Sequence, residues 1–396
     1  MTRSLLIALC AAVLPAACGR PVDETRNASG YGEPGTPLPG LTESELARFE
    51  AGRTWFDHGF TPEEGLGPLY NQPRCSSCHD LPEIGGYGSE RLSKANRWDP
   101  ASSRCDALDA QGGEIIQRQV TDAYRAEGGE PERVPSGATH VVQFVSSPAF
   151  GVGLIEAIPE SEIERRADPD DSDGDGISGR VTRDAAGRLG RFGRRAGAPD
   201  LSNFVAGALV LEQGVTSAAF PLENTLNGQP LPPGADVVPD PEMNDSTLAL
   251  IVDYVRFLAL PQREAAAGVA ADTIQRGERV FFEVGCALCH VPTLETGPNE
   301  VAALDRKVVA LWSDLLLHDM GPEMASVCAG NAGPSEFRTT PLAGLRLRQP
   351  FMHNGAGFDL RESIELHGGE SAASRDAFRR VDEPARDALL RFLRSL

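Results

Sequence analysis

Two segments, QPRCSSCHD at residues 72–80 and VGCALCHVP at residues 284–292, each contain the pentapeptide Cys-x-x-Cys-His. This motif is typical of covalent haem attachment, in which two thiols add to the vinyl groups of haem and the adjacent histidine binds the iron. A structural zinc site needs four ligands in one cluster, and a redox-active dithiol does not need the histidine. We therefore predict two haem c groups, held by the cysteines and axial histidines of the motifs: Cys75, Cys78 and His79, then Cys286, Cys289 and His290.

Similar helices are expected before the two motifs. RFEAGRTWF (48–56) and QRGERVFF (275–282) share the pattern Gly-x-x-x-aromatic, and Thr42-x-x-Glu45 resembles a capping box that starts the first helix. Glycine would allow each helix to approach a neighbour closely beside its haem. The pattern predicts a mainly α fold of two cytochrome-c-like haem domains, with long irregular loops and little β-structure.

The boundary between these domains is expected in the Pro- and Gly-rich segment 223–242. Apolar residues at helical spacing predict two further helices, at 247–261 and 383–396. We therefore divide the folded chain into an N-terminal haem domain at 42–240, which includes an acidic loop, and a C-terminal haem domain at 241–396.

The first residues predict export. Arg3 precedes the apolar run LLIALCAAVL, and small residues precede Cys18 as in a bacterial lipobox, although Pro15 replaces the usual aliphatic residue. We predict a signal peptide at 1–17 and a lipid-anchored tether at 18–41, so that membrane contact is made only through the anchor. The expected location is the bacterial periplasm, as a lipoprotein, and an ordinary secretory signal peptide is the alternative.

The net charge limits the kinds of binding partner, and the remaining cysteines bear on the redox compartment. A formal net charge of −20 disfavours nucleic acid, because phosphate binding requires a basic surface, and it is compatible with a basic redox protein or a small molecule. Cys10 leaves with the signal peptide, and Cys18 is the lipidation site. Once the motifs are assigned, Cys105 and Cys328 remain, and in an oxidising compartment they are expected to form a disulfide.

An acidic loop, DSDGDGISG at 171–179, carries Asp171, Asp173 and Asp175 at alternate positions with a glycine at the turn. Hard oxygen ligands at this spacing form the front of a calcium loop. Thr182 stands where an EF-hand requires glutamate. The loop therefore predicts a calcium site completed by remote oxygens, and a solvated acidic turn is the alternative.

Several further segments, taken together with both haem motifs, resemble one protein family. The segments are FGVGLIEAIPESEI (150–163), DPDDSDGDGISGR (168–180), RFGRRAGAPDL (191–201), SDLLLHDMGPEMA (313–325), FRTTPLAGLRLRQPFMHNG (337–355) and IELHGGE (364–370). The sequence is similar to the di-haem oxidoreductases once described as thiol oxidoreductase-like. That family is related to bacterial di-haem cytochrome c peroxidases and to the di-haem enzyme that matures methylamine dehydrogenase.

The resemblance implies the ligands of the second haem. In the related peroxidases a Pro-aromatic-x-His-x-Gly segment precedes the distal ligand, and here PFMHNG supplies His353, with His367 following 14 residues later. The relatives carry methionine at that second place, so a His290/His367 pair is expected to lower the potential of this haem. Met320 and Met352 are competing ligands.

The resemblance also implies residues around the haems. Arg338 and His353 are similar to residues that approach the haem propionates, for which guanidinium geometry is suited. His318 is expected either as a ligand or as a hydrogen-bonding group near a propionate. Trp312 is a candidate for assisting electron transfer between the haems, and a core tryptophan is the alternative.

For the first haem the resemblance implies distal residues. The relatives hold a displaceable histidine shortly before a Ser/Ala-Pro segment, and His140 precedes Ser147-Pro148 by seven residues; a packed or surface histidine is the alternative. Glu156 lies where the relatives place their distal pocket, and an apolar setting would raise its pKa so that it moves a proton between peroxide oxygens. A glutamate paired with an arginine is the alternative.

These observations together predict an exported di-haem c-type cytochrome oxidoreductase that is peroxidase-like. One haem would relay electrons, and the other would react with a small oxidant such as hydrogen peroxide, with a redox protein as partner. The alternatives are a pure electron-transfer cytochrome with two six-coordinate irons and an oxidase of a protein partner.

Overall fold

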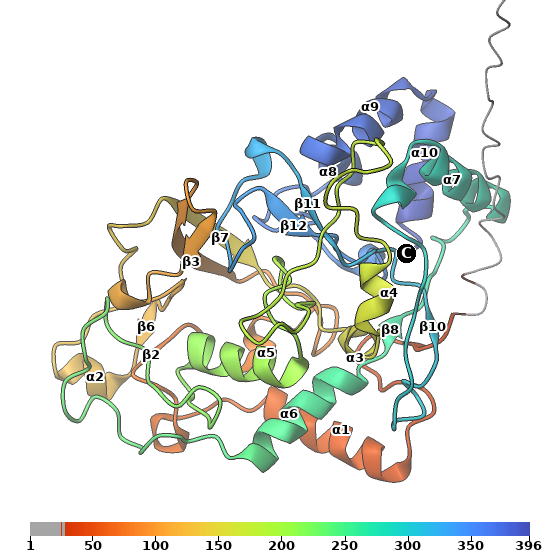
Figure 1. Cartoon of the computed structure of the whole chain (residues 1–396). Coiled ribbons are helices and arrows are strands. Elements are labelled where there is room, and N and C mark those ends of the chain that lie inside the picture. The colour runs from red at the N-terminus through yellow and green to blue at the C-terminus, as the bar shows by residue number, and fades with distance from the viewer. Residues whose placement is uncertain (1–24, 26–27) are drawn as a thin grey trace, which may run out of the picture.

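The computed structural model describes residues 25 and 28–396, so the predicted signal peptide, Cys18 and the first part of the tether lie outside the described residues. Helices, one four-stranded sheet and several two-stranded ladders are joined by long loops (Figure 1). Helical residues outnumber strand residues, as predicted. None of the described helices has the length and apolar character that spanning a bilayer requires.

The first helix pair is formed by α1 (Glu43–Phe56) and α6 (Asp245–Phe257). The capping box is confirmed, because the Thr42 hydroxyl accepts the Glu45 amide and the Glu45 carboxylate accepts the Thr42 amide. Gly52 permits the close crossing, since an added Cβ would overlap the carbonyl oxygen of Leu250. The ring of Tyr254, four residues along α6, closes the contact.

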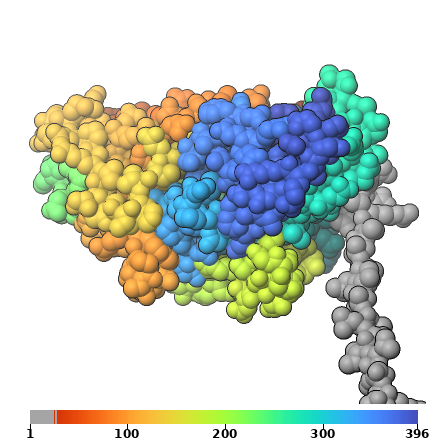
Figure 2. Space-filling view, turned by 90° about the horizontal axis from the view of Figure 1, so that it is seen from above, coloured from red at the N-terminus to blue at the C-terminus, as the bar shows by residue number. Residues whose placement is uncertain are grey.

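The second pair, α7 (Ala271–Glu283) and α10 (Glu383–Leu393), repeats this arrangement. A Cβ at Gly277 would overlap the carbonyl oxygen of Ala388, and the ring of Phe392, four residues along α10, lies 5.5 Å from that of Phe281. In both helix pairs a glycine of the first helix contacts a backbone carbonyl of the second, and an aromatic residue lies four positions after that carbonyl. In Figure 2 the C-terminal segment in blue packs against teal α7.

Two large clusters of buried apolar side chains form the core. One joins α1 and α6 to α3 (Val152–Glu156) and α5 (Leu201–Ala208). The other surrounds α7 and α10 and includes Trp312, whose ring lies 5.5 Å from Phe281 and 5.3 Å from Phe392. Trp312 is thus packed in the core, which is the alternative that the sequence offered to a role in electron transfer. The boundary at residue 240 stays a prediction, although α6, which follows it, packs on α1 in the first cluster.

A four-stranded antiparallel sheet lies beside the helices, and it is larger than the expected little β-structure. Its central strand β3 (Arg91–Asp99) pairs with β4 (Arg104–Asp106), β5 (Ile115–Ile116) and β7 (His140–Val145). The β3 sequence RLSKANRWD lacks the clean alternation by which a half-buried strand is recognised. Cys105 on β4 forms a disulfide with Cys328, 223 residues away, and fastens the sheet to the C-terminal half.

The other described elements are short. They are α2 (Asp122–Ala126), α4 (Glu160–Glu164), α8 (Leu360–Glu365), α9 (Ala372–Arg380) and four two-stranded ladders: β1 (Tyr31–Gly32) with β8 (Leu260–Pro261), β2 (Leu69–Tyr70) with β6 (Gln119–Val120), β9 (Leu294–Glu295) with β10 (Val308–Val309), and β11 (Leu317–Asp319) with β12 (Glu336–Arg338).

Candidate functional site

The first Cys-x-x-Cys-His motif follows α1 and forms a tight 3-10 turn at Cys75–Ser77. Cys75 and Cys78 carry free thiols, and burial raises the pKa of Cys75 to about 11. Nδ1 of His79 donates to the carbonyl oxygen of Gly86 over 2.9 Å, which leaves Nε2 for an iron. Burial lowers the pKa of His79, so the ring is held neutral, as a metal ligand must be.

The second motif has the same local geometry. Nδ1 of His290 donates to the carbonyl oxygen of Trp312 over 3.0 Å. Nδ1 of His367 donates to the carbonyl oxygen of Ser363 over 2.8 Å, so Nε2 is free on both rings. Burial lowers the pKa of His290 to about 4, and His367 adds to this shift, which places the two histidines close together. His367 thus lies in the surroundings of His290, and its role as the second ligand of that haem stays a prediction.

The motif residues are only partly exposed. Cys75, His79, Cys286, His290 and His367 each keep part of their surface accessible, and burial raises the pKa of the thiols and lowers the pKa of the imidazoles. Two cysteines for thioether bonds to the vinyl groups and a neutral imidazole for the iron are the groups that covalent haem requires.

Four arginines whose pKa is lowered by burial cluster around Arg194, beside His353, and none of them forms an ion pair with another described residue. They are Arg194, Arg195, Arg338 and Arg348. Burial lowers the pKa of Arg194 and Arg195 to about 9, and none of the four forms an ion pair with a described carboxylate. Nη1 of Arg195, Nη1 of Arg338 and Nε of Arg348 are buried and have no hydrogen-bond acceptor. Orphaned buried cations fit an anionic group such as haem propionates.

Arg194 links Arg338 to the surroundings of His353, and the approach of these two residues to haem propionates stays a prediction. His353 is buried, and burial followed by the charges of Arg194 and Arg195 lowers its pKa to about 3. The sequence interpretation missed Arg194, Arg195 and Arg348. The paired arginines of RFGRRAG, which have no acidic neighbour within four residues, were the available signal.

His318 is engaged on both sides and does not offer a nitrogen to an iron. Nε2 lies 2.9 Å from Asp314 and Nδ1 lies 2.8 Å from Glu370. Burial alone would lower its pKa, but hydrogen bonds to Asp314, Cys289 and Glu370 raise it to about 12. Of the two roles expected for His318, the structure favours that of a hydrogen-bonding group beside the second motif.

His140 is not brought to His79. Its ring lies 3.0 Å from the Thr139 hydroxyl at the start of β7, and it is partly exposed. The Ser146 hydroxyl donates to the carbonyl of Cys78, and His140 lies six residues earlier, or about 20 Å of extended chain. The packed or surface alternative therefore describes His140 better than the role of sixth ligand.

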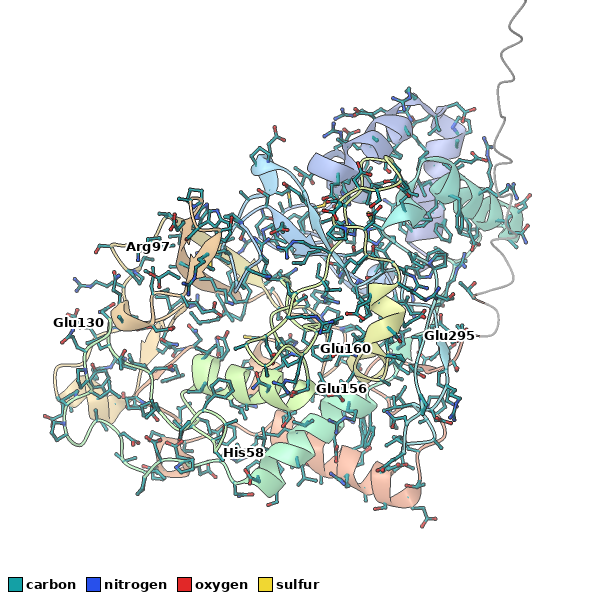
Figure 3. The ribbon with its side chains drawn as sticks, viewed as in Figure 1. His58, Arg97, Glu130, Glu156, Glu160 and Glu295 are labelled. Atoms are coloured by element: carbon teal, nitrogen blue, oxygen red, sulfur yellow. A yellow bond between two sulfur atoms is a disulfide. The ribbon has the colours of Figure 1, made fainter. Side chains whose placement is uncertain are left out.

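Glu156 requires a correction. Oε2 pairs with Nε of Arg256 over 2.7 Å, and Oε1 accepts the amide of Leu201 over 2.9 Å. Figure 3 shows Glu156 where α3 meets α6, so the glutamate ties these helices together. Its carboxylate is fully engaged by polar groups rather than set among apolar ones, because α3 presents it to a cationic side chain 100 residues away.

Glu212 is a carboxylate near the first motif that the sequence interpretation did not single out. It lies in the helical segment Leu209–Gln213 that follows α5, and its Oε2 accepts a hydrogen bond from Nδ2 of Asn71 over 3.1 Å. Burial raises the pKa of Glu212 to about 7, although the Asn71 hydrogen bond opposes this. Burial and then the charge of Glu212 raise the pKa of Cys78 to about 12, which places Glu212 beside the first motif. The next residue, Gln213, contacts Cys75 Sγ at 3.3 Å.

The acidic loop gathers the three predicted carboxylates. One oxygen each from Asp171, Asp173 and Asp175 lies within 4.8 Å of the others, and all three side chains are wholly or partly exposed. The loop turns into Ser178, whose hydroxyl donates to Glu370 over 2.8 Å. Glu370 thus connects the loop to His318. Calcium binding at the loop stays a prediction.

One protein family and several solved structures resemble this chain. A family model described as "Di-haem oxidoreductase, putative peroxidase" matches residues 137–396, which include the second haem motif but not the first. No curated protein matches the sequence significantly. The chain is similar to the di-haem peroxidase BthA from Burkholderia thailandensis E264, with 16% identity, a TM-score of 0.45 and coverage of 92% of this chain and 89% of that chain.

Two further solved structures are similar at the same level. One is a MauG-like protein associated with microbial copper homeostasis, with 15% identity, a TM-score of 0.38 and 92% of both chains covered. The other is hydrazine synthase from Kuenenia stuttgartiensis, with 15% identity, a TM-score of 0.41 and 100% of both chains covered. With scores below 0.5, these likenesses carry no argument about function, whereas the family model covers about two thirds of the chain.

Proposed function

The chain belongs to the di-haem oxidoreductase family, and from that membership we propose that it is an exported, peroxidase-like c-type oxidoreductase with two covalently bound haems. The observation that carries the proposal is a difference between the two motifs. His367 lies near His290 and keeps its Nε2 available, whereas His140 is held at the Thr139 hydroxyl, and no other described histidine makes a ring contact with His79. One iron would be closed by protein ligands and the other open.

Each haem, when bound, would supply an iron that exchanges single electrons, and an iron with an open position also binds a small oxidant such as hydrogen peroxide. The protein groups then divide the work. His290 and His367 would hold the iron of the second haem, which suits electron relay. The carbonyls of Trp312 and Ser363 fix the tautomer of these two rings and raise their basicity.

At the first motif, His79 would bind the iron and Glu212 would carry the proton. A carboxyl group that moves a proton works best when its pKa is near the operating pH, and burial gives Glu212 a pKa of about 7. Asn71 orients the carboxylate by donating to Oε2. Glu212 thereby takes the role that the sequence interpretation gave to Glu156.

The buried arginines provide the anion sites that two haems require. Arg338 and Arg348 have nitrogens free to bind propionate oxygens, and Arg194 and Arg195 add positive charge to the same region. Neutralising buried cations in this way would favour haem-bound folding. Export as a periplasmic lipoprotein, a redox partner protein and calcium at the acidic loop complete the proposal.

The proposal is tested by the spectrum and the peroxide reaction of the haem-loaded protein. Electron paramagnetic resonance should show one high-spin and one low-spin ferric haem, and one equivalent of hydrogen peroxide should remove the high-spin signal. Two low-spin haems that do not react with peroxide would instead identify the protein as an electron carrier.

Paired variants test the assignment of the proton carrier. Glu212→Gln should slow the reaction with peroxide by about 100-fold or more, the range for loss of a general acid or base, and should abolish the pH dependence near neutrality. Glu156→Gln is the matched control and should leave the rate per folded molecule unchanged. Equal rates in the two variants would remove Glu212 from the mechanism.

A further inference from the structure

Four carboxylates outside both haem motifs meet just before α6. They belong to Glu223, Asp236, Asp240 and Glu242, and one oxygen from each lies within 4.8 Å of the others. They lie on the green segment that leads from α5 to α6 in Figure 1. None of the ion pairs found among the described residues includes any of the four.

Three oxygens of this carboxylate cluster are buried without donors, whereas Asp240 is exposed to solvent. Both carboxylate oxygens of Glu223 and Oε1 of Glu242 expose less than 1 Å² each, and no described residue donates a hydrogen bond to them. Thr216 engages only the other side of the cluster, through its amide to Oε2 of Glu242 at 2.7 Å and its hydroxyl to Oδ1 of Asp240 at 2.6 Å. Buried polar atoms in folded proteins normally have partners, so three orphaned carboxylate oxygens in one place point to a missing cationic one.

We propose that Glu223, Asp236, Asp240 and Glu242 bind one divalent cation of the calcium type. Calcium takes six to eight oxygen ligands at about 2.4 Å, so two ligands on opposite sides of the ion lie about 4.8 Å apart. The four oxygens fit within that limit, and water completes the shell. The site is separate from the acidic loop at residues 171–175. A proton on Glu223 that is donated to Glu242 would satisfy two of the three orphaned oxygens and would leave the second oxygen of Glu223 without a donor.

The bound cation would join two loops of the first haem unit. The loop from Thr216 to Glu223 follows Gln213, whose amide contacts Cys75 Sγ, and the loop from Asp236 to Glu242 ends two residues before Asn244, the N-cap of α6. Neutralising the four carboxylates therefore holds the start of α6 against the segment that borders the first haem motif.

Calcium binding to the full haem-loaded chain tests the proposal. After treatment with the chelator EGTA, equilibrium dialysis measures bound calcium, and thermal unfolding is followed with and without the metal. The Glu223→Gln/Glu242→Gln double variant should bind one calcium fewer than the parent. The Asp171→Asn/Asp173→Asn variant, altered only in the acidic loop, is the control and should retain that calcium.

The stabilities give an independent readout. Calcium at 100 times its Kd should shift the folding equilibrium of the parent by about 100-fold and raise its unfolding midpoint, with no rise in the double variant. In EGTA the double variant should be the more stable protein, because the repulsion between buried carboxylates is relieved. Equal calcium binding by parent and double variant, or none by the parent at millimolar calcium, would overturn the proposal.

A milder substitution keeps the test decisive if the double variant does not fold. Asp236 is only partly buried, and Asp236→Asn leaves both orphaned glutamates in place. It should weaken calcium binding by about tenfold, since the number of charged ligands sets affinity. An unchanged calcium Kd in this variant would exclude the cluster as the site.

Discussion

Gly277→Ala should destabilise the protein even though alanine is the better helix former. Gly277 lies within α7, where replacing glycine by alanine at an open position stabilises by about 0.5–1 kcal/mol. Here the added methyl would overlap the carbonyl oxygen of Ala388 and crowd the Cβ of Phe392 on α10. The obstacle is backbone, which cannot rotate aside as a side chain can.

The size of the effect follows from these two opposing contributions. Overpacking in a closely packed core costs about 1–3 kcal/mol, and contact with backbone belongs at the upper end of that range. After subtraction of the helix-propensity gain, the expected net loss is about 2 kcal/mol in the free energy of unfolding. Gly52 contacts the carbonyl of Leu250 in the same way, so Gly52→Ala should lose a similar amount.

Gly207→Ala is the matched control. Gly207 lies in α5, and an added Cβ would meet only the ring of Phe220 at 3.6 Å, an ordinary van der Waals contact. This variant should be as stable as the parent or more stable. Denaturant unfolding of the three haem-loaded proteins, followed by far-ultraviolet circular dichroism, measures the differences. If Gly277→Ala is as stable as Gly207→Ala, α7 and α10 do not cross at this glycine, and the reasoning fails.

Three further predictions follow from the same contacts. His318 has a raised pKa of about 12 and Glu370 a lowered pKa of about 2, so their pair contributes fully between the ordinary values of 4.5 and 6.5. The free energy of unfolding should fall as pH rises from 6.5 toward 12 and also as pH falls from 4.5 toward 2. The alkaline fall should be less steep in His318→Gln, and equal alkaline slopes in the parent and this variant would contradict the prediction. His367→Ala should convert the second haem from low-spin to high-spin in its optical spectrum, and a spectrum that stays low-spin would point to another ligand. Replacing Cys105 and Cys328 by serine should cost about 5 kcal/mol, because the disulfide closes a loop of 223 residues, and an unchanged denaturation midpoint would refute this.

Features written in consecutive residues were predictable from the sequence. The two Cys-x-x-Cys-His motifs, the capping box at Thr42 and Glu45 and the Gly-x-x-x-aromatic helices all depend on spacings of a few residues. Backbone geometry fixes what such spacings can do, so the position of each motif after its helix could be inferred. The pairing of Cys105 with Cys328 was predictable only because every other cysteine had been assigned.

The tertiary structure decided which polar groups meet, because their partners lie far along the chain. Glu156 looked apolar in its local sequence, and the fold pairs it with Arg256, whereas Glu212 is brought to Asn71, 141 residues away, beside the first motif. Electrostatic environment depends on distance in space and on burial, and the sequence around a carboxylate records neither. The sequence by itself therefore determined where the two Cys-x-x-Cys-His motifs lie and which helices precede them, and its resemblance to the family pointed to His367. Only the packing decided which carboxylate lies near the first motif and which arginines cluster beside His353.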